Sequence, residues 1–332
     1  MAENTLDKLI RARMLGKSPF GAFLRFNNWV WNFIPRSWRE VAPFRWYGRF
    51  INALVRRYAD RTQYFGTFFL RNRPQLDLIC RLSRIVEHDS TLNIAVLGCS
   101  NGAEVYSILA TLRRTRPELK VVLHAVDISA DVLAIAQKGS YSISSPELVG
   151  EVIFQRITSQ EIAAMFDREA DRVTVQPWLR EGIVWQHGDV RDPEVLHRVG
   201  RQDIVVANNF LCHMRPAQAE ECLLGIAPLV KPGGYLVISG IDLDVRAKVA
   251  LAQNWKPVAA LLEDVHNGDT ALRNDWPFSY WGLEPFDRHR PHREHRYAAI
   301  FQIGQQPAPA APAGSTDRAE LSGAKAHQTM DT

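Results

Sequence analysis

The chain has 332 residues, of which 46% are hydrophobic and 23% are charged, and its formal net charge is +4. This length allows one large or two modest domains with a buried core. No apolar run reaches the roughly 18 residues of a membrane span, and the N-terminus lacks the apolar core of a signal peptide. The four cysteines lie far apart without a C-x-x-C pair, which argues against a disulfide framework or a zinc site and favours the reducing cytoplasm.

Residues 1–62 form a basic region rich in Trp and Arg. The first 90 residues contain 16 Lys and Arg against 7 Asp and Glu, a net charge of +9, so the remainder of the chain carries −5. Three prolines divide the region into short helical pieces, the last over 49–58. It could be a helical subdomain packed on a sheet with solvated arginines, or a face for a peripheral membrane or protein partner. Nucleic acid is the weakest candidate, because no RNP or helix-turn-helix pattern accompanies the charge.

Residues 63–90 lead into the first strand. They contain the short motif Thr67-x-Phe69-Leu70-Arg71, and a helix is expected over 72–87. We therefore treat this segment as a helical lead-in to the domain that follows.

The next stretch is the most informative part of the chain. It begins with a buried strand over 93–97, followed by a tight turn bracketed by Gly98 and Gly102, where a missing Cβ lets a ligand approach the backbone. Apolar residues then recur at helical spacing, and a second strand ends at the acid Asp127. An acid at that position can hold two vicinal ribose hydroxyls. The pattern predicts a nucleoside-binding β-α-β unit.

The turn itself indicates which nucleoside is bound. A dinucleotide fold expects G-x-G-x-x-G so that a pyrophosphate can lie on the helix N-terminus, whereas 98–104 reads GCSNGAE. The glycine spacing differs, and Glu104 would repel a pyrophosphate. S-adenosylmethionine (SAM) has no phosphate and carries an ammonium and a sulfonium, which an acid suits. We favour SAM over a nicotinamide cofactor and over a sheet without a cofactor.

Further strands and helices alternate along the chain. A helix over 130–138 has a serine cap and a terminal glycine, and a mixed segment over 141–180 follows. A strand over 182–186 precedes Asp189 and Val190, which by their position in the sheet would flank the adenine.

The fourth strand, over 203–208, leads to Asn208 and Asn209. These two residues would line the floor of the site at the carboxyl end of that strand. A helix over 216–230, a fifth strand over 235–239 and a late strand over 296–303 complete the pattern. Such alternation favours a parallel sheet with helices on both faces.

Two segments near the C-terminus are expected to lie outside this framework. Residues 287–295 contain three histidines among arginines, and crowded arginines with a proline argue against a metal site, so a solvated loop is expected. Residues 304–332 are rich in Ala and Pro and then polar, which predicts disorder.

Several segments resemble the motifs of one family. Residues 100–108, SNGAEVYSI, are similar to S-T-G-E-E-P-Y-S-I, and 67–71 is similar to T-x-F-F-R. Residues 202–214 resemble F-D-x-I-x-x-R-N-V-x-x-Y-F, and 229–240, LVKPGGYLVISG, matches the helix end and strand that follow. These are motifs of the CheR-type methyltransferases, which methylate glutamates on chemotaxis receptors. The resemblance covers roughly 63–303.

The resemblance implies a fold, a cofactor and ligand contacts. The expected fold is a class I SAM methyltransferase, α/β and Rossmann-like with a mostly parallel sheet over 91–303, behind an N-terminal helical region. The cofactor would be SAM, with Glu104 at its amino end and Asp127 at its ribose. Arg71 would orient a carboxylate, either of the cofactor or of the acceptor, and Thr67 would hydrogen-bond nearby.

Three departures from the family pattern concern the acceptor side. Asn208 replaces an arginine, His213 replaces a tyrosine and Phe65 replaces an asparagine. A carboxylate acceptor such as a protein glutamate is ionised at neutral pH and needs no general base. A hydroxyl on a small molecule or glycan needs one, and His213 could serve. A third possibility is a SAM-binding module without catalysis. We favour the carboxylate, with Arg71 and His213 as candidate catalytic residues.

Overall fold

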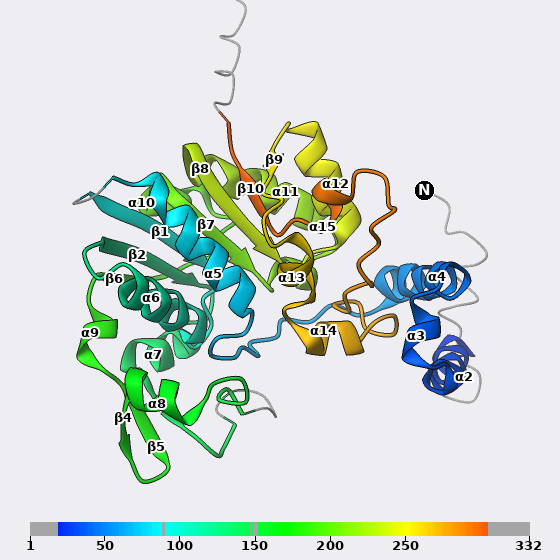
Figure 1. Ribbon diagram of the computed structural model, residues 1–332, viewed down its shortest axis with the longest axis horizontal. Coiled ribbons are helices and arrows are strands. Elements are labelled where there is room, and N and C mark those ends of the chain that lie inside the picture. The colour runs from blue at the N-terminus through cyan, green and yellow to red at the C-terminus, as the bar shows by residue number, and fades with distance from the viewer. Residues whose placement is uncertain (1–18, 88–89, 147, 149–151, 305–332) are drawn as a thin grey trace, which may run out of the picture.

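The structure is a computed structural model that describes residues 19–87, 90–146, 148 and 152–304 (Figure 1). Apart from Gly304, the tail expected to be disordered lies outside these residues, as does the beginning of the N-terminal region. Within the described ranges, no helix is long and apolar enough to cross a membrane. The four cysteines are buried and form no disulfide.

A seven-stranded sheet in the described part of the chain has the order β6-β2-β1-β7-β8-β10-β9 (Figure 1). The first five strands in this order are parallel, whereas β10 runs antiparallel to both β8 and β9. This is the mostly parallel, Rossmann-like sheet of a class I methyltransferase. The strands are β1 (Thr91–Leu97), β2 (Lys120–Asp127), β6 (Ile183–His187), β7 (Gln202–Asn208), β8 (Val230–Ser239), β9 (Lys256–Pro257) and β10 (Ile300–Gln302).

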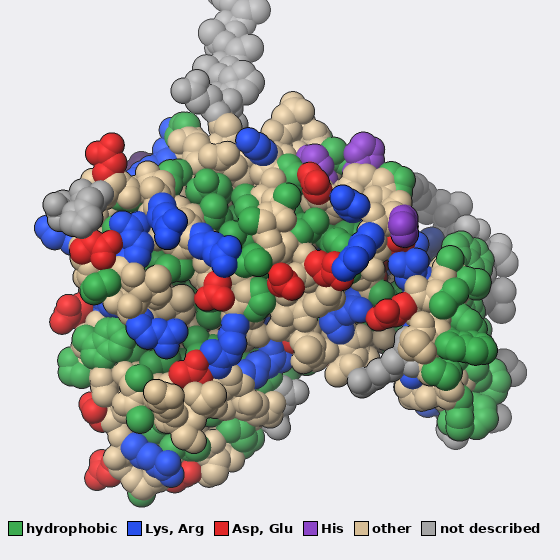
Figure 2. Space-filling view, in the orientation of Figure 1, with side chains coloured by type: hydrophobic (Ala, Val, Ile, Leu, Met, Phe, Trp, Pro, Cys, Tyr) green, Lys and Arg blue, Asp and Glu red, His purple; other side chains and the backbone are tan. Residues whose placement is uncertain are grey.

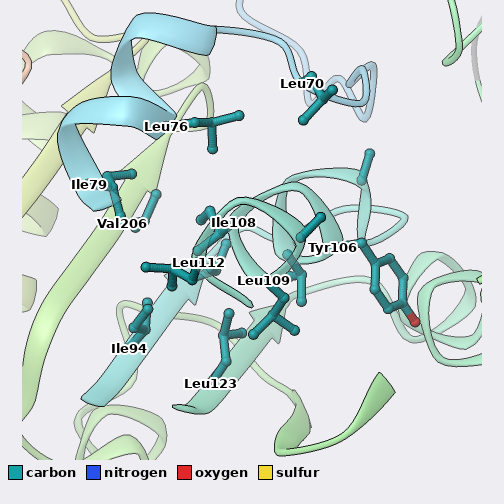
Figure 3. Packing of buried hydrophobic residues seen from close by; sticks show 14 of the residues in the cluster. Leu70, Leu76, Ile79, Ile94, Tyr106, Ile108, Leu109, Leu112, Leu123 and Val206 are labelled. Atoms are coloured by element: carbon teal, nitrogen blue, oxygen red, sulfur yellow. The ribbon is translucent and has the colours of Figure 1, made fainter. Parts of the chain in front are cut away.

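Helices cover both faces of the sheet. Alternate residues of β1 belong to two different cores: Ile94 packs with one cluster and Ala95 with the other. Figure 3 shows the first core, to which Ile79 and Leu109 of two helices and Leu123 of a strand belong. That face carries α5 (Arg73–Leu82), α6 (Ala103–Thr115), α7 (Ala130–Lys138), α9 (Pro177–Arg180) and α13 (Leu262–Asn267). The other carries α10 (Pro193–Val199), α11 (Pro216–Ile226) and α12 (Leu243–Ala252).

Local sequence accounts for most helix ends. The Asn72 side chain accepts a hydrogen bond from the Gln75 backbone and begins α5, while Ser129 caps α7, which ends at Gly139 with φ +59°. Two helices stop earlier than expected. Helix α5 gives way to the 3-10 turn η1 (Ser83–Ile85), and α11 to η3 (Ala227–Leu229), where a proline removes a backbone donor.

The mixed segment contains a small second sheet of order β3-β5-β4. Its strands are β3 (Ser140–Ser142), β4 (Phe166–Glu169) and β5 (Arg172–Val175), with helix α8 (Ser159–Met165) before β4. Phe69 of the lead-in motif is fully buried against this sheet, with ring centroids 5.1 Å from Phe154 and 5.0 Å from Phe166. Phe69 therefore anchors the lead-in between the two sheets.

The N-terminal region forms three helices: α2 (Pro19–Phe33), α3 (Arg36–Arg39) and α4 (Ala42–Tyr58). Helices α2 and α4 have 15 and 17 residues, so they are longer than the short pieces predicted, and the last begins at Ala42 rather than at residue 49 because Pro43 is accommodated in its first turn. They do not pack on the sheet, which corrects one of the interpretations above. Instead, Trp31 lies 5.6 Å from Trp276, and Ile51 packs with Tyr280, so these helices rest on the segment 276–287 that follows α14 (Thr270–Asn274). Figure 1 shows them to one side of the sheet.

The last part of the described chain differs from the prediction. The late strand begins at Ile300, because the preceding residues form helix α15 (Arg293–Tyr297). Arg296 is held there by Glu284, with Nε to Oε1 at 2.7 Å, and by Asp244. The expected solvated loop is also anchored, since Asp287 is buried and paired with arginines of α4. Its histidines are part of no candidate metal-binding group in the described ranges.

Candidate active site

A cavity of about 370 Å³ opens where β1, β2, β7 and β8 end. This is the edge at which open α/β sheets bind ligands. The remaining walls come from segment 63–76, helix α4 and segment 272–284. Ten of the predicted site residues line the cavity: Thr67, Arg71, Gly98, Glu104, Asp127, Asp189, Val190, Asn208, Asn209 and His213.

The two turn glycines differ in role. Gly98 has φ +70° and lines the cavity, and a Cβ there would lie 3.0 Å from the Phe210 ring. Gly102 has φ +85° but is not part of the cavity wall; a Cβ there would meet Ala136 of α7 at 3.0 Å. The expectation that Gly102 admits a ligand is therefore corrected. Its missing Cβ lets α6 begin close against α7.

Asp127 is held firmly by the backbone. Its side chain accepts hydrogen bonds from Ser100 N at 2.8 Å and Ser129 N at 2.9 Å, and the residue is 4% exposed. Burial raises the pKa of Asp127, and the two backbone bonds offset part of that rise. The carboxylate is thereby fixed in orientation at the end of β2.

Glu104, in the first turn of α6, is the second acid of the cavity and is partly buried. Asn208 donates from Nδ2 to its Oε1 at 2.6 Å. Burial raises the pKa of Glu104, while the Asn208 bond and the charge of Arg71 lower it in part. A cationic group in the cavity would favour the ionised form of both acids.

Unpaired polar atoms lie beside Glu104. Asn208 also donates to Gln75 Oε1 at 2.9 Å, but Asn208 Oδ1 and Gln75 Nε2 have no hydrogen-bond partner in the described part of the chain. Both residues line the cavity. One offers an acceptor and the other a donor, and buried polar atoms of this kind usually have a partner. They suit a ligand that carries both an ammonium and a carboxylate.

Asp189, Val190 and Thr67 complete the predicted set. Asp189 follows β6, and its hydrogen bond from Arg191 lowers its pKa. Val190 is 8% exposed and offers an apolar surface. Thr67 lines the cavity two residues after Phe65, whose carbonyl accepts from Ser100 Oγ at 2.7 Å. The lead-in is thus tied directly to the glycine turn.

Arg71 lies at the end of the lead-in motif and lines the cavity, and Asp269 holds its guanidinium group. Its Nε donates to Asp269 Oδ2 at 2.6 Å, and Arg156 pairs with the other oxygen of Asp269 at 2.8 Å. Both guanidinium groups lie over the Phe68 ring, at 5.7 Å for Arg71 and 4.3 Å for Arg156. Among the residues described, the two Nη atoms of Arg71 make no hydrogen bond, since its bond to Asp269 comes from Nε. They can therefore receive an anionic group.

His213, in the turn that follows β7, lines another part of the cavity. Its Nδ1 is 2.9 Å from the Tyr280 hydroxyl, and the two rings meet edge to face. Burial lowers the pKa of His213, and the charges of Arg61 and Arg71 lower it further. The imidazole is consequently neutral at pH 7.

Arg61 fastens this part of the cavity together. It donates to the backbone carbonyls of Cys212 at 2.9 Å and Met214 at 2.7 Å and pairs with Asp242 at 3.0 Å. Its guanidinium also lies 5.3 Å from the Tyr280 ring. The 3-10 turn η2 (Leu211–His213) is therefore fixed from the N-terminal side of the chain.

Residues 66–243 match the family described as CheR methyltransferase, SAM binding domain. The chain belongs to the CheR family. It is 27% identical over 195 residues to an uncharacterized 104.1 kDa protein of Rhodobacter capsulatus, covering 54% of this chain and 19% of that protein. It is 24% identical over 167 residues to a chemotaxis protein methyltransferase of Vibrio parahaemolyticus, covering 48% of this chain and 58% of that one. The chain thus spans less than two thirds of these relatives.

Solved structures give a weaker likeness. An O-methyltransferase family protein from Burkholderia thailandensis is 17% identical, covers 80% of this chain and 60% of its own, and has a TM-score of 0.36. Magnesium protoporphyrin IX methyltransferase from Synechocystis, solved with bound SAM, is 16% identical, covers 63% of this chain and 88% of its own, and has a TM-score of 0.34.

The CheR-family domain is a SAM-binding domain, and SAM is its cofactor. The cavity fits that ligand in charge: the acids Asp127 and Glu104 suit the sulfonium and ammonium, and the unpaired atoms of Asn208 and Gln75 suit an amino-acid end. Its volume of about 370 Å³ is within the usual range for small-molecule sites. Asp127, Glu104 and Asn208 are the residues that would hold it.

Several residues of the cavity were not predicted. Tyr280 and Asp269 line the cavity but are far from the CheR motifs in sequence, and no local pattern distinguishes them. Arg61, just before the Thr67 motif, supports the cavity through Cys212 and Met214 without lining it. Asn52 and Arg56 line the wall from α4, before the family match begins. Only contacts between distant segments identify these residues.

Proposed function

We propose that the protein methylates a carboxylate, most specifically the side chain of a protein glutamate, with SAM as methyl donor. The observation that carries this proposal is Arg71. Arg71 lines the same cavity as Glu104 and Asp127, and its Nη atoms make no hydrogen bond within the described residues. A guanidinium can hold a carboxylate through two parallel hydrogen bonds. The names of the chemotaxis protein methyltransferases that resemble this chain support a protein acceptor.

The chemistry asks little of the protein beyond alignment. When bound, SAM supplies an electrophilic methyl group on a sulfonium, which a carboxylate oxygen can take without losing a proton. The charges of anion and cation disappear together, as an ester and a thioether form. Arg71, backed by Asp269, would orient the carboxylate, and the aromatic residues around it would exclude water.

The remaining predicted residues keep their proposed roles. Glu104, Asn208 and Asn209 would hold the amino-acid end of SAM, and Asp127 its ribose. Asp189 and Val190 would flank the adenine, with Thr67 and Gly98 closing the wall.

The domain division is also a proposal. Residues 1–62 would be a distinct region, 63–90 the lead-in and 91–303 the methyltransferase domain. We call the part of the cavity around His213 and Tyr280 the acceptor end. The N-terminal helices contact segment 276–287, which includes Tyr280, so they would belong to the acceptor end as well.

A second candidate is methylation of a hydroxyl on a small molecule or glycan. It is favoured by the neutral His213, whose Nδ1 is fixed by Tyr280. If Nδ1 donates to the tyrosine oxygen, Nε2 has a lone pair that can accept the hydroxyl proton. The third candidate, a SAM-binding module without catalysis, would bind SAM and transfer nothing.

The experiment uses methyl-labelled SAM with the full chain, offered a membrane and protein fraction or a small-molecule extract. Labelled protein that releases methanol in mild alkali indicates a carboxyl ester. An alkali-stable product indicates a methyl ether and favours the hydroxyl acceptor. SAM binding without labelling of any fraction would contradict both enzymatic proposals. Asp127→Ala serves as the variant without cofactor binding.

A further inference from the structure

The N-terminal helices carry a concentration of exposed large apolar side chains. Of the 16 such residues in the described part of the chain, nine lie between residues 23 and 50, and Phe33 and Trp46 are each 69% exposed. We call these nine residues the aromatic surface. They are Phe23, Phe26, Trp29, Val30, Phe33, Trp38, Val41, Trp46 and Phe50. Figure 2 shows hydrophobic side chains gathered over α2 to α4 at one side of the molecule.

These residues form neighbouring clusters rather than isolated exposures. On α2, Trp29 contacts Phe33 with ring centroids 4.7 Å apart and Phe26 at 6.2 Å. On α4, Trp46 stacks on Phe50 at 6.3 Å. Contiguous exposed apolar surface of this kind marks an interaction site.

Helix α4 separates its two apolar faces cleanly. Ile51 and Val55 face the body of the protein and are buried, whereas Trp46 and Phe50 point to solvent. The exposed face continues about two turns further to Arg57, which is also exposed. A helix with two apolar faces, only one of which packs on the protein, needs a second apolar partner for the exposed face.

Charge indicates what that environment is. Residues 19–58 contain seven arginines and a single acid, Glu40. Arg45, Arg49 and Arg56 pair with acids of the body, but Arg25 lies exposed on α2 beside the aromatic surface. The surface is therefore apolar, with the exposed arginines Arg25 and Arg57 on the same helices.

We propose that the aromatic surface binds the surface of a lipid bilayer that contains anionic lipids. Trp and Phe insert at the level of the headgroups, and arginines attract anionic lipids. A second copy of the chain is a poorer partner, because two surfaces of like charge would face each other. This binding requires no methyl transfer and does not depend on the proposed function.

The test is co-sedimentation of the full chain with vesicles of phosphatidylcholine, with and without phosphatidylglycerol. We expect binding to the anionic vesicles, weakening as salt is added, with a blue shift of tryptophan fluorescence. Trp29→Ala/Phe33→Ala/Trp46→Ala should reduce the partition coefficient at least about tenfold. Leu224→Ala/Leu251→Ala, at exposed apolar residues of α11 and α12, should bind like the parent chain.

Several results would overturn the proposal. They are no sedimentation with either vesicle, equal binding of the triple variant, or binding lost only when residues 1–18 are removed. A dimer that the triple variant abolishes, without vesicle binding, would assign the surface to a second copy instead. Helix content and SAM affinity of each variant show that it is folded, and the single variant Phe33→Ser repeats the test with less disturbance.

Discussion

The two ends of the cavity are built in different ways. At the cofactor end, Asp127 is oriented by backbone N–H groups of Ser100 and Ser129, which are 27 and two residues away from it. At the acceptor end, His213 meets Tyr280 across 67 residues and is supported by Arg61 across about 150. The placement of Asp127 is a product of a single β-α-β unit, although Glu104 at the same end also accepts a bond from Asn208 across 104 residues. The surroundings of His213 exist only once more distant segments have folded together.

Their electrostatics differ as well. Burial raises the pKa values of Glu104 and Asp127, because the positive charge and hydrogen bonds around these acids do not fully compensate for their lost solvation. Burial would also raise the pKa of Glu284, beyond the acceptor end, but the hydrogen bond and charge of Arg296 reverse this and lower it. A cationic ligand would therefore stabilise the ionised acids of the cofactor end, whereas Glu284 already has its counter-ion, Arg296, within the chain.

The strongest test of the cofactor end is Asp127→Ala. Two ribose hydroxyls bonded to one carboxylate are charge-assisted contacts, so SAM affinity should fall at least about tenfold, or about 1.4 kcal/mol, by calorimetry. Asp127→Asn, which keeps the side-chain volume, should weaken binding too. Asp131→Ala, at an exposed acid in the first turn of α7, is the matched control. Unchanged affinity in a folded Asp127 variant would contradict the ribose assignment.

Arg71 connects the two ends, and Arg71→Lys tests that link. An ammonium cannot make two parallel bonds to a carboxylate, so turnover on the true acceptor should fall about tenfold. Arg156→Lys changes the other arginine on Asp269 without touching the cavity, and its turnover should remain near that of the parent chain. Equal rates for both variants would make Arg71 a structural cation only.

The pH profile of turnover distinguishes the acceptor classes. With a carboxylate acceptor, no proton is removed and the rate should be flat from about pH 6 to 8, and His213→Tyr should stay active. With a hydroxyl acceptor, the neutral imidazole is the base, so the rate rises with pH. Because the pKa of His213 is lowered, that rise should be centred below 6.5 and level off by neutral pH.

Tyr280→Phe refines this measurement. It removes the hydrogen bond at His213 Nδ1 and should move the rising limb only if the histidine is the base. His213→Phe should abolish the limb altogether in that case. A sloped profile on a protein glutamate would contradict the assignment of both classes.

A smaller effect is expected where the N-terminal helices join the acceptor end. Asp287 pairs with Arg45 and Arg49, which together with a backbone hydrogen bond outweigh burial and lower its pKa. Asp287→Asn should cost about 1 kcal/mol or less of unfolding free energy at pH 7, measured by urea denaturation. The difference from the parent chain should vanish as pH falls below the lowered pKa. Glu263→Gln, in an exposed pair with Arg288, should change stability less.

The sequence predicted the β-α-β unit beside the cavity because its signals are local. A strand, a glycine turn, a helix and an acid follow one another, and the sheet brings them together by a fixed rule. Gly102 shows the limit of such signals. A glycine in this turn can make room either for a ligand or for a neighbouring helix, and the local sequence does not distinguish the two. Arg296 shows another: its apolar neighbours suggest a strand, but two distant acids hold it in a helix. Tyr280 has no local signal at all.

The matched family begins at residue 66, but the folded unit begins earlier. Asp242 is 5% exposed, and its two cations, Arg56 and Arg61, both precede that boundary. A protein truncated at residue 66 would leave a buried carboxylate without counter-ions and a cavity without one wall, and it should fold poorly. The segment that matches the family, residues 66–243, is therefore shorter than the unit that folds cooperatively. A chimera with a relative should exchange the longer unit, which begins before residue 66.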